Sequence, residues 1–321
     1  MIGVTLLENP RMVRILCALY PIRKPVSGIS ALWVGLRHPK FAWIYFSGIS
    51  MAMPFSSFFR RLFWTYASLR NSVESIFDYS WILSGSVATL SQRGGNTRLE
   101  GLSHLTAAVS TGAPLVVYTC HTGPFFNSLF HPDIKAAIRG RRVLLLAPTG
   151  GQKRKKMLEE KIQSHLGKEF EIAGIDQENV GLKVLKTLKR NGIVICTLDL
   201  SFPQTKNRWI TLLKRPVELP IGIIEVGLKL EAIFVASIPT LHGGGIRVRF
   251  EKPVRFRRSD MAPQDCLSVL LETVEKTILE KPSRYTMWPW FHNYQRHIHS
   301  VQRKHIFNPP EKAAGQLSRK D

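Results

Sequence analysis

The sequence is poor in acidic residues. Only 23 of its 321 residues are Asp or Glu, against 45 Lys and Arg, so the formal net charge is +22. A hydrophobic share of 44% excludes a disordered basic protein, because such chains have too few apolar residues to offset the entropy lost on folding. The charge must therefore cover the surface of a folded protein. It predicts anionic partners, namely nucleic acid, an acidic membrane or an acidic carrier protein.

Cysteine is also scarce, and the motifs that would use it are missing. The four cysteines are Cys17, Cys120, Cys196 and Cys266. They form no C-x-x-C pair and have no histidine at metal-ligand spacing, which argues against structural zinc and indicates a reducing compartment. The sequence has no zinc-finger, helix-turn-helix or RNP-type motif. The positive charge is thus the only feature that favours nucleic-acid binding. It is not specific enough by itself, so we expect no nucleic-acid partner.

Long hydrophobic runs are limited to one stretch near the N-terminus. Residues 41–59 form an uncharged run of 19, bounded by Lys40 and by Arg60-Arg61. That length is enough to cross a bilayer, but serines, glycine and Pro54 interrupt the run, and Pro54 should bend it. Three interpretations stay open: an interfacial helical hairpin or membrane anchor, a buried core helix, or a true span. The aromatic residues beside basic ones are typical of a membrane interface.

The pattern along the chain predicts three parts. Residues 1–90 should be a helical, aromatic-rich, membrane-proximal region, residues 91–301 an α/β domain, and residues 302–321 a disordered tail. The stretch 91–101 is a turn-rich break between the first two.

Within the middle part, short apolar runs alternate with helical periodicity. The predicted buried strands are 115–120, 142–147, 193–198 and 232–238, and the predicted helices are 152–166, 177–190, 219–229 and 263–280. Residues 245–256 alternate strictly and predict a half-exposed edge strand. Such alternation of strands and helices predicts an α/β fold with a largely parallel central sheet flanked by helices.

His121 is the first candidate for catalysis. It directly follows the apolar run 115–120 and precedes Gly123 and Pro124. Ligands of open α/β sheets bind beyond the carboxyl ends of the strands, and a histidine there is suited to act as a general base. The alternative is a histidine that only caps a turn.

Four sequence blocks in a fixed order then point to a family. They are EGLSHLTAAVSTGAPLVVYTCHTG, KTLKRNGIVICTLD, WITLLKRPVELPIGIIEVGLKLEAIFVASIP and ILEKPSRYTMWPWFHN. In order and spacing across residues 98–293, about 60% of the chain, they resemble the lipid A lauroyl/myristoyl acyltransferases of the lysophospholipid acyltransferase superfamily. The N-terminal RHPKFAWIYFS also resembles the membrane-proximal region of that family.

The resemblance implies a catalytic His121, but one partner is replaced. The family motif is a histidine followed after four residues by Asp or Glu, whereas this chain has Phe126 in the carboxylate position. In one interpretation Asp199, which ends the run GIVICTLD, supplies the carboxylate, although it would also suit a turn cap. Asp133 is a poorer candidate. In the other two, His121 acts unassisted, or the protein is an inactive homologue that binds lipid or acyl carrier.

The resemblance further implies transfer of a fatty acyl group to a hydroxyl or amine. The donor would be an acyl-carrier-protein or coenzyme A thioester, and no metal or redox cofactor is implied. A lipid A precursor or related glycolipid is the expected acceptor, with an acceptor of specialised metabolism as the alternative. The implied partners are acyl carrier protein and anionic membrane lipids. The implied location is the cytoplasmic face of a bacterial inner membrane.

Candidate substrate-binding residues complete the predicted site. They are Gly123, Lys153, Arg154 and Arg208. Gly123 offers a backbone N–H to an oxyanion, and the basic residues would attract an anionic ligand, with a solvated basic face as the alternative for Lys153 and Arg154. Two blocks depart from the family, since Ala147 stands where an arginine is common and TLLKRP replaces an aromatic, glycine-containing block. Tyr285, Trp288 and Trp290 match a C-terminal aromatic signature, but they would equally serve as core residues.

Overall fold

The computed structural model describes residues 9–147, 152–175, 177–200, 206–242, 245–257, 259 and 261–292. Its first part is helical, as predicted. The elements there are α2 (Pro10–Ala18), the 3-10 helix η1 (Tyr20–Ile22), α3 (Arg23–Arg37), α4 (Pro39–Ala52), α5 (Phe58–Ser84) and α6 (Val87–Gly95). The predicted tail at 302–321 lies outside the described residues.

The uncharged run 41–59 is divided between two helices. Its first part belongs to α4, which ends at Ala52, and α5 begins at Phe58 with the Ser57 hydroxyl accepting from the Arg60 N–H. The break contains Pro54, which lacks the N–H that a continuing helix would need. None of the helices within the described ranges combines the length and the apolar character that a membrane crossing requires.

The rest of the described chain alternates strands and helices. The strands are β1 (Arg98–Glu100), β2 (Leu115–Thr119), β3 (Val143–Ala147), β4 (Phe170–Gly174), β5 (Ile193–Thr197), β6 (Asn207–Leu212), β7 (Arg215–Pro220), β8 (Ile233–His242), β9 (Gly245–Phe250) and β10 (Val254–Arg255). The helices are α7 (Leu102–Ser110), η2 (Phe125–Phe130), α8 (Pro132–Ala137), α9 (Gln152–Leu166), α10 (Val180–Lys189), α11 (Gly222–Lys229), α12 (Pro263–Glu280) and η3 (Pro282–Arg284).

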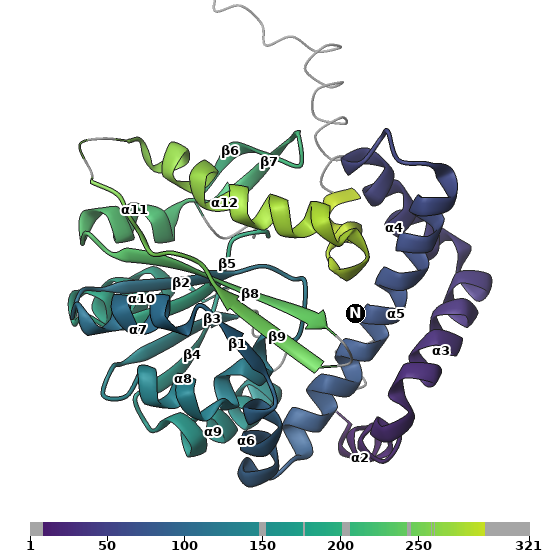
Figure 1. Cartoon of the computed structure of the whole chain (residues 1–321), viewed down its shortest axis with the longest axis horizontal. Helices are drawn as coiled ribbons and strands as arrows, with labels where there is room; N and C mark the ends of the chain where they lie inside the picture. The colour runs from purple at the N-terminus through teal and green to yellow at the C-terminus, as the bar shows by residue number, and fades with distance from the viewer. Residues whose placement is uncertain are drawn as a thin grey trace, which may run out of the picture.

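The protein has an α/β fold with a mixed, mostly parallel central sheet flanked by helices, which confirms the predicted α/β architecture (Figure 1). The strand order is β1-β9-β8-β2-β5-β3-β4, with β10 on β8. The five strands from β8 to β4 all run parallel, while β9 and β10 run antiparallel to β8. Strands β2, β3 and β5 are almost continuously apolar because helices cover both faces of the sheet.

Several predicted elements need correction. The stretch 245–256 is not an edge strand: its first half is β9, which pairs with β8 on one side and β1 on the other. Pro253 separates β9 from β10, and proline cannot donate to a sheet ladder. The predicted break 91–101 is partly helix α6, and the predicted helix 219–229 starts only at Gly222. Strands β1 and β4 and the hairpin β6–β7 were not predicted.

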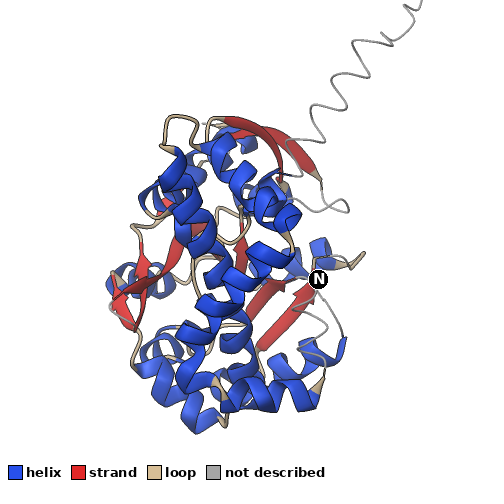
Figure 2. Ribbon diagram, turned by 90° about the vertical axis from the view of Figure 1, so that its right-hand side faces the viewer, coloured by secondary structure: helices blue, strands red, loops and turns tan. Residues whose placement is uncertain are grey.

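The N-terminal helices lie across the edge of the sheet where β8 ends (Figure 1), and helices stand in front of the strands in the turned view (Figure 2). This arrangement is anchored through the C-terminal segment. The Asn71 amide donates to the Ser283 carbonyl at 2.6 Å, and a Cβ on Gly48 of α4 would collide with the Trp288 carbonyl. The carboxyl edge of the sheet is therefore bordered by α4, α5 and residues 282–292.

Candidate active site

His121 and Asp199 come together because of the register of two neighbouring strands. Strands β2 and β5 are parallel, and Thr119 pairs with Thr197 at their carboxyl ends. His121 and Asp199 each follow two residues after these threonines. His121 and Asp199 therefore occupy equivalent positions just beyond the carboxyl ends of two adjacent parallel strands. This is the edge of the sheet at which ligands are expected to bind.

The two residues are linked by three close contacts. The His121 Nδ1 lies 2.9 Å from Asp199 Oδ1 and 3.0 Å from Oδ2, and the His121 backbone N–H donates to Oδ2 at 2.9 Å. The Asp199 side chain is fully buried, whereas 25% of the His121 side chain is exposed. A carboxylate on Nδ1 favours the tautomer with the proton on that nitrogen. The lone pair then sits on Nε2, the nitrogen that a base must offer to a substrate.

The C-terminal segment fixes the backbone of both residues. The Thr286 N–H donates to the His121 carbonyl at 3.1 Å, and the Thr286 hydroxyl also reaches it, at 3.3 Å. The Tyr285 hydroxyl donates to the Asp199 carbonyl at 3.5 Å. Burial, and secondly the charge of Asp199, raise the pKa of Tyr285 well above its usual value, so it stays a neutral donor. The sequence analysis singled out Tyr285 as part of a C-terminal aromatic signature, but it did not identify Thr286 as an anchor for the His121 backbone.

A tight turn after His121 rests on strand β8. The Thr122 hydroxyl donates to the Pro239 carbonyl at 3.1 Å. A Cβ on Gly123 would lie 2.9 Å from the same carbonyl oxygen, closer than packed atoms approach. Glycine is thus required at position 123 by close packing. The Gly123 backbone N–H lies in the turn that carries His121. The role that the sequence predicts for it, hydrogen bonding to an oxyanion, stays a prediction.

The neighbouring cysteine is unsuited to be a nucleophile. Cys120 is 1% exposed, and its thiol lies 3.3 Å from the Thr122 hydroxyl. Burial, followed by the charge of Asp199, raises the pKa of Cys120 far above its usual value. The thiolate, which is the reactive form, is therefore not formed at neutral pH. Cys120 is therefore not a candidate nucleophile beside His121 and Asp199.

Phe126, in the position of the family carboxylate, packs in an aromatic cluster. It lies in η2, with its ring centroid 5.2 Å from Tyr79 of α5 and 5.9 Å from Phe125. Asp133 is also not a partner of His121, since its side chain is 63% exposed and lies 3.9 Å from His131. Of the carboxylates considered from sequence, the structure brings Asp199 to His121.

Of the predicted basic residues, the structure describes the side chain of Arg208, which lies apart from this pair. Lys153 and Arg154 lie in the first turn of α9, which follows β3 at the same edge of the sheet, but their side chains are outside the described part. Arg208 lies on the separate β6–β7 sheet, exposed, and its guanidinium donates to the Asn207 carbonyl at 3.4 Å. Within the described ranges, no three His, Cys, Asp or Glu side chains are grouped as metal binding requires.

The arrangement therefore offers a positioned base whose second ring nitrogen is held by a buried carboxylate. Such a pair can remove a proton from a hydroxyl or an amine that attacks a carbonyl carbon. The chain matches no protein-family model, and a search of curated proteins finds no match.

Proposed function

We propose that this protein is a membrane-associated acyltransferase. It would move a fatty acyl group from an acyl-carrier-protein or coenzyme A thioester to a hydroxyl or amine. The observation that carries the proposal is the contact of His121 Nδ1 with the buried Asp199 carboxylate, at 2.9 Å. The order of the four sequence blocks, which resembles the lipid A acyltransferases, supports it independently. A lipid A precursor or related glycolipid is the acceptor that this resemblance favours.

In the proposed reaction, His121 Nε2 takes the proton of the acceptor as its oxygen or nitrogen attacks the thioester carbon. Asp199 stabilises the imidazolium that forms and keeps the ring in place. The tetrahedral intermediate collapses with cleavage of the carbon–sulfur bond. The leaving thiolate then takes the proton from His121, which returns the site to its starting state. Positioned acid–base catalysis of this kind contributes about 10²–10⁴-fold to the rate.

An exposed apolar surface on the N-terminal helices supports attachment to a membrane. We call it the apolar face. Its members are Ile29, Leu32, Trp33 and Leu36 on α3, Phe41 and Trp43 on α4, Phe55 in the connecting turn, and Phe58, Phe59, Leu62 and Phe63 on α5. On α3 these residues follow a spacing of three and four, so they share one side of the helix. A large exposed apolar surface of this kind is typical of an interaction site.

Aromatic contacts connect the α4 and α5 portions of the apolar face. Trp43 stacks on Phe46 with ring centroids 5.5 Å apart, Phe46 lies 5.5 Å from Phe58, and Phe58 lies 5.8 Å from Phe59. Phe55 is 100% exposed and Phe59 is 80% exposed. Lys40 and Arg60, which flank this stretch in the sequence, are exposed, and the Arg61 guanidinium lies 5.6 Å from the Phe46 ring centroid. Aromatic rings flanked by cations suit the interface of an anionic bilayer.

The occupant that we propose for the apolar face is therefore a membrane surface. Together with the family resemblance, it supports a location at the cytoplasmic face of a bacterial inner membrane. Acyl carrier protein is acidic in this scheme, and the net charge of +22 would attract both it and the anionic lipid.

The test is incubation of the purified protein with acyl-loaded carrier protein and a bacterial membrane extract, followed by mass spectrometry of the lipids. The wild type should yield an acylated product, and His121→Ala should yield none above the background. The same reaction with acyl-coenzyme A distinguishes the two donors. Absence of product from the wild type with both donors would reject the enzyme. Vesicle binding without turnover would instead favour an inactive homologue, the reading that Phe126 suggests.

A further inference from the structure

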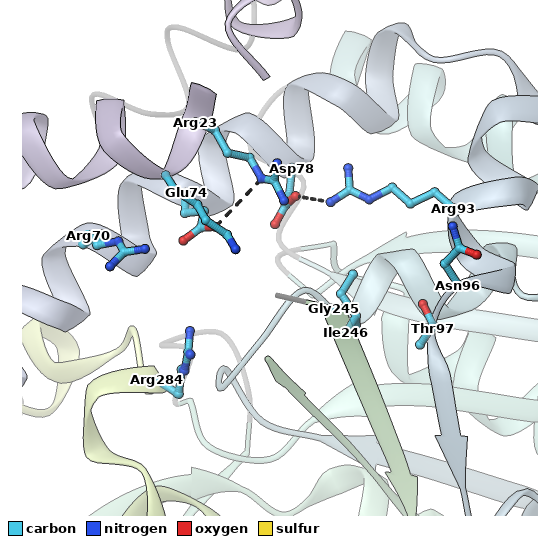
Figure 3. A pocket seen from close by; sticks show the side chains of 11 residues that line it. Arg23, Arg70, Glu74, Asp78, Arg93, Asn96, Thr97, Gly245, Ile246 and Arg284 are labelled. Atoms are coloured by element: carbon cyan, nitrogen blue, oxygen red, sulfur yellow. Dashed lines mark hydrogen bonds and ion pairs between the residues drawn. The ribbon is translucent and has the colours of Figure 1, made fainter. Parts of the chain in front are cut away.

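A second polar site lies between the N-terminal helices and the sheet, apart from His121. It is a cavity of about 220 Å³ bordered by α3, α5, α6, the start of β9 and η3 (Figure 3). Neither His121 nor Asp199 lines it. At that volume it holds several water molecules, or a small polar group with some of them.

The cavity is strongly cationic. Five cations line it, Arg23 and Lys24 from α3, Arg70 from α5, Arg93 from α6 and Arg284 from η3. Two carboxylates, Glu74 and Asp78 of α5, face them, which leaves an excess of three positive charges. Figure 3 shows Arg284 pointing into the cavity from the side opposite Glu74. Cations from separate elements that converge on one cavity repel one another unless an anion lies between them.

Buried donors in the cavity lack protein partners. Arg70 Nε, Arg93 Nη1 and the Thr97 hydroxyl are buried, and none of them has a hydrogen bond within the described structure. Thr97 is only 3% exposed and lines the cavity. A buried donor without an acceptor costs about 1–3 kcal/mol. Three such donors around one cationic cavity indicate an oxygen-rich anion as the missing acceptor.

The cations are held in place before any ligand arrives. Arg93 lies 4.5 Å from the Tyr20 ring centroid and 4.6 Å from that of Trp81, and its Nη2 contacts Asp78 at 2.6 Å. The Arg284 guanidinium donates to the Asn71 side-chain oxygen at 3.3 Å. Guanidinium groups fixed in this way lose little freedom on binding and match the oxygens of a phosphate.

We propose that this cavity binds a phosphate group, donated either by free phosphate or by the headgroup of an anionic lipid. The inference does not depend on acyl transfer. Phosphate oxygens can accept hydrogen bonds from the unpaired donors of the cavity wall, and the negative charge of phosphate matches the excess positive charge there. The cavity is lined from α3 and α5, the helices that also carry part of the apolar face, so a lipid headgroup is one of the two phosphate sources to be tested.

Asp78 makes the cavity sensitive to pH. Burial raises the pKa of Asp78 to about 7; Arg23 opposes this shift and Glu74 adds to it. Tyr20, which donates to Asp78 at 3.0 Å, and Arg93 complete the groups that face it. Protonation of Asp78 removes one negative charge and releases Arg93, whose pKa of about 10 keeps it cationic. The affinity for an anion of fixed charge, such as sulfate, should therefore increase as the pH falls through 7.

The test uses calorimetric titration of the whole protein with inorganic phosphate, and cosedimentation with vesicles with and without phosphatidic acid. Arg70→Gln and Arg284→Gln should weaken binding at least tenfold, and Thr97→Val severalfold. Arg139→Gln is the matched control, because Arg139 is an exposed arginine that does not line the cavity. It removes the same charge and should change affinity less than twofold. Circular dichroism and melting temperatures verify that each variant is folded.

The outcomes separate the two sources of phosphate. Binding of inorganic phosphate that Arg70→Gln and Arg284→Gln remove supports the site with a soluble ligand. Binding only to phosphatidic acid vesicles, lost in the same variants, supports it with a lipid ligand. The proposal is overturned if the wild type binds neither probe, or if Arg139→Gln weakens binding as much as the cavity variants.

Discussion

Asp199→Asn tests the role of the buried carboxylate most directly. Asp199 accepts from both the backbone N–H and the Nδ1 of His121. An asparagine oxygen can still accept from the backbone N–H, which leaves its NH₂ group directed at Nδ1. The NH₂ group in the place of Oδ1 lies 2.9 Å from Nδ1, and repulsion between two donors at that distance favours the tautomer with Nδ1 as acceptor and the proton on Nε2. The nitrogen that should take the substrate proton is then already occupied.

The size of the effect follows from that change of tautomer. A misplaced base proton removes the contribution of general base catalysis, about 10²–10⁴-fold in turnover, which equals about 2.7–5.4 kcal/mol of barrier. Stability should change much less, because the buried backbone N–H keeps its acceptor. Asp199→Ala removes that acceptor as well, so it should cost a further ~1–3 kcal/mol of folding free energy. Asparagine is therefore the cleaner variant.

The assay compares initial rates of product formation by mass spectrometry for the wild type, Asp199→Asn, His121→Ala and the double variant. Residues that act as a unit are not additive, so the double variant should be no slower than His121→Ala alone. Asp133→Asn is the matched control, since Asp133 is exposed and lies beside His131. A folded Asp199→Asn protein with turnover within threefold of the wild type would refute the reasoning and leave His121 to act unassisted.

Three further predictions address packing, membrane attachment and pH. Gly48→Ala should lower the free energy of unfolding by about 1–3 kcal/mol in chemical denaturation, because its Cβ collides with the Trp288 carbonyl. Gly35→Ala, in α3 with open space around it, should instead raise the free energy of unfolding by about 0.5–1 kcal/mol. Equal changes in the two variants would contradict the close contact between Gly48 and the Trp288 carbonyl. Phe59→Ser, at an 80% exposed ring, should weaken cosedimentation with anionic vesicles about tenfold, since roughly 1.5–3 kcal/mol accompanies full burial of a phenylalanine; unchanged binding would rule out the apolar face. Sulfate, which stays a dianion, should bind more tightly at pH 6 than at pH 8 to the wild type but not to Asp78→Asn, as measured by calorimetry. If the wild-type affinity did not depend on pH, protonation of Asp78 would not regulate anion binding in the cavity.

Patterns of neighbouring residues predicted much of the fold. Apolar runs of strand length correspond to β2, β3, β5 and β8, and the helix predicted at 263–280 coincides with α12. These signals are local, because a strand buried on both faces must be apolar throughout its length. The failures occurred where pairing decides the structure. Strand β1 has only three residues and exists because β9 offers it a partner, and β9 became an inner strand for the same reason.

For the candidate site, the sequence by itself determined that His121 and Asp199 each follow a buried strand, and hence that both lie at one edge of the sheet. Only the tertiary structure decided that they touch. Contact depends on the pairing of Thr119 with Thr197, and a slip of one residue would separate the side chains. The cationic cavity was not predictable at all, because its arginines span positions 23 to 284 and chain folding alone brings them together.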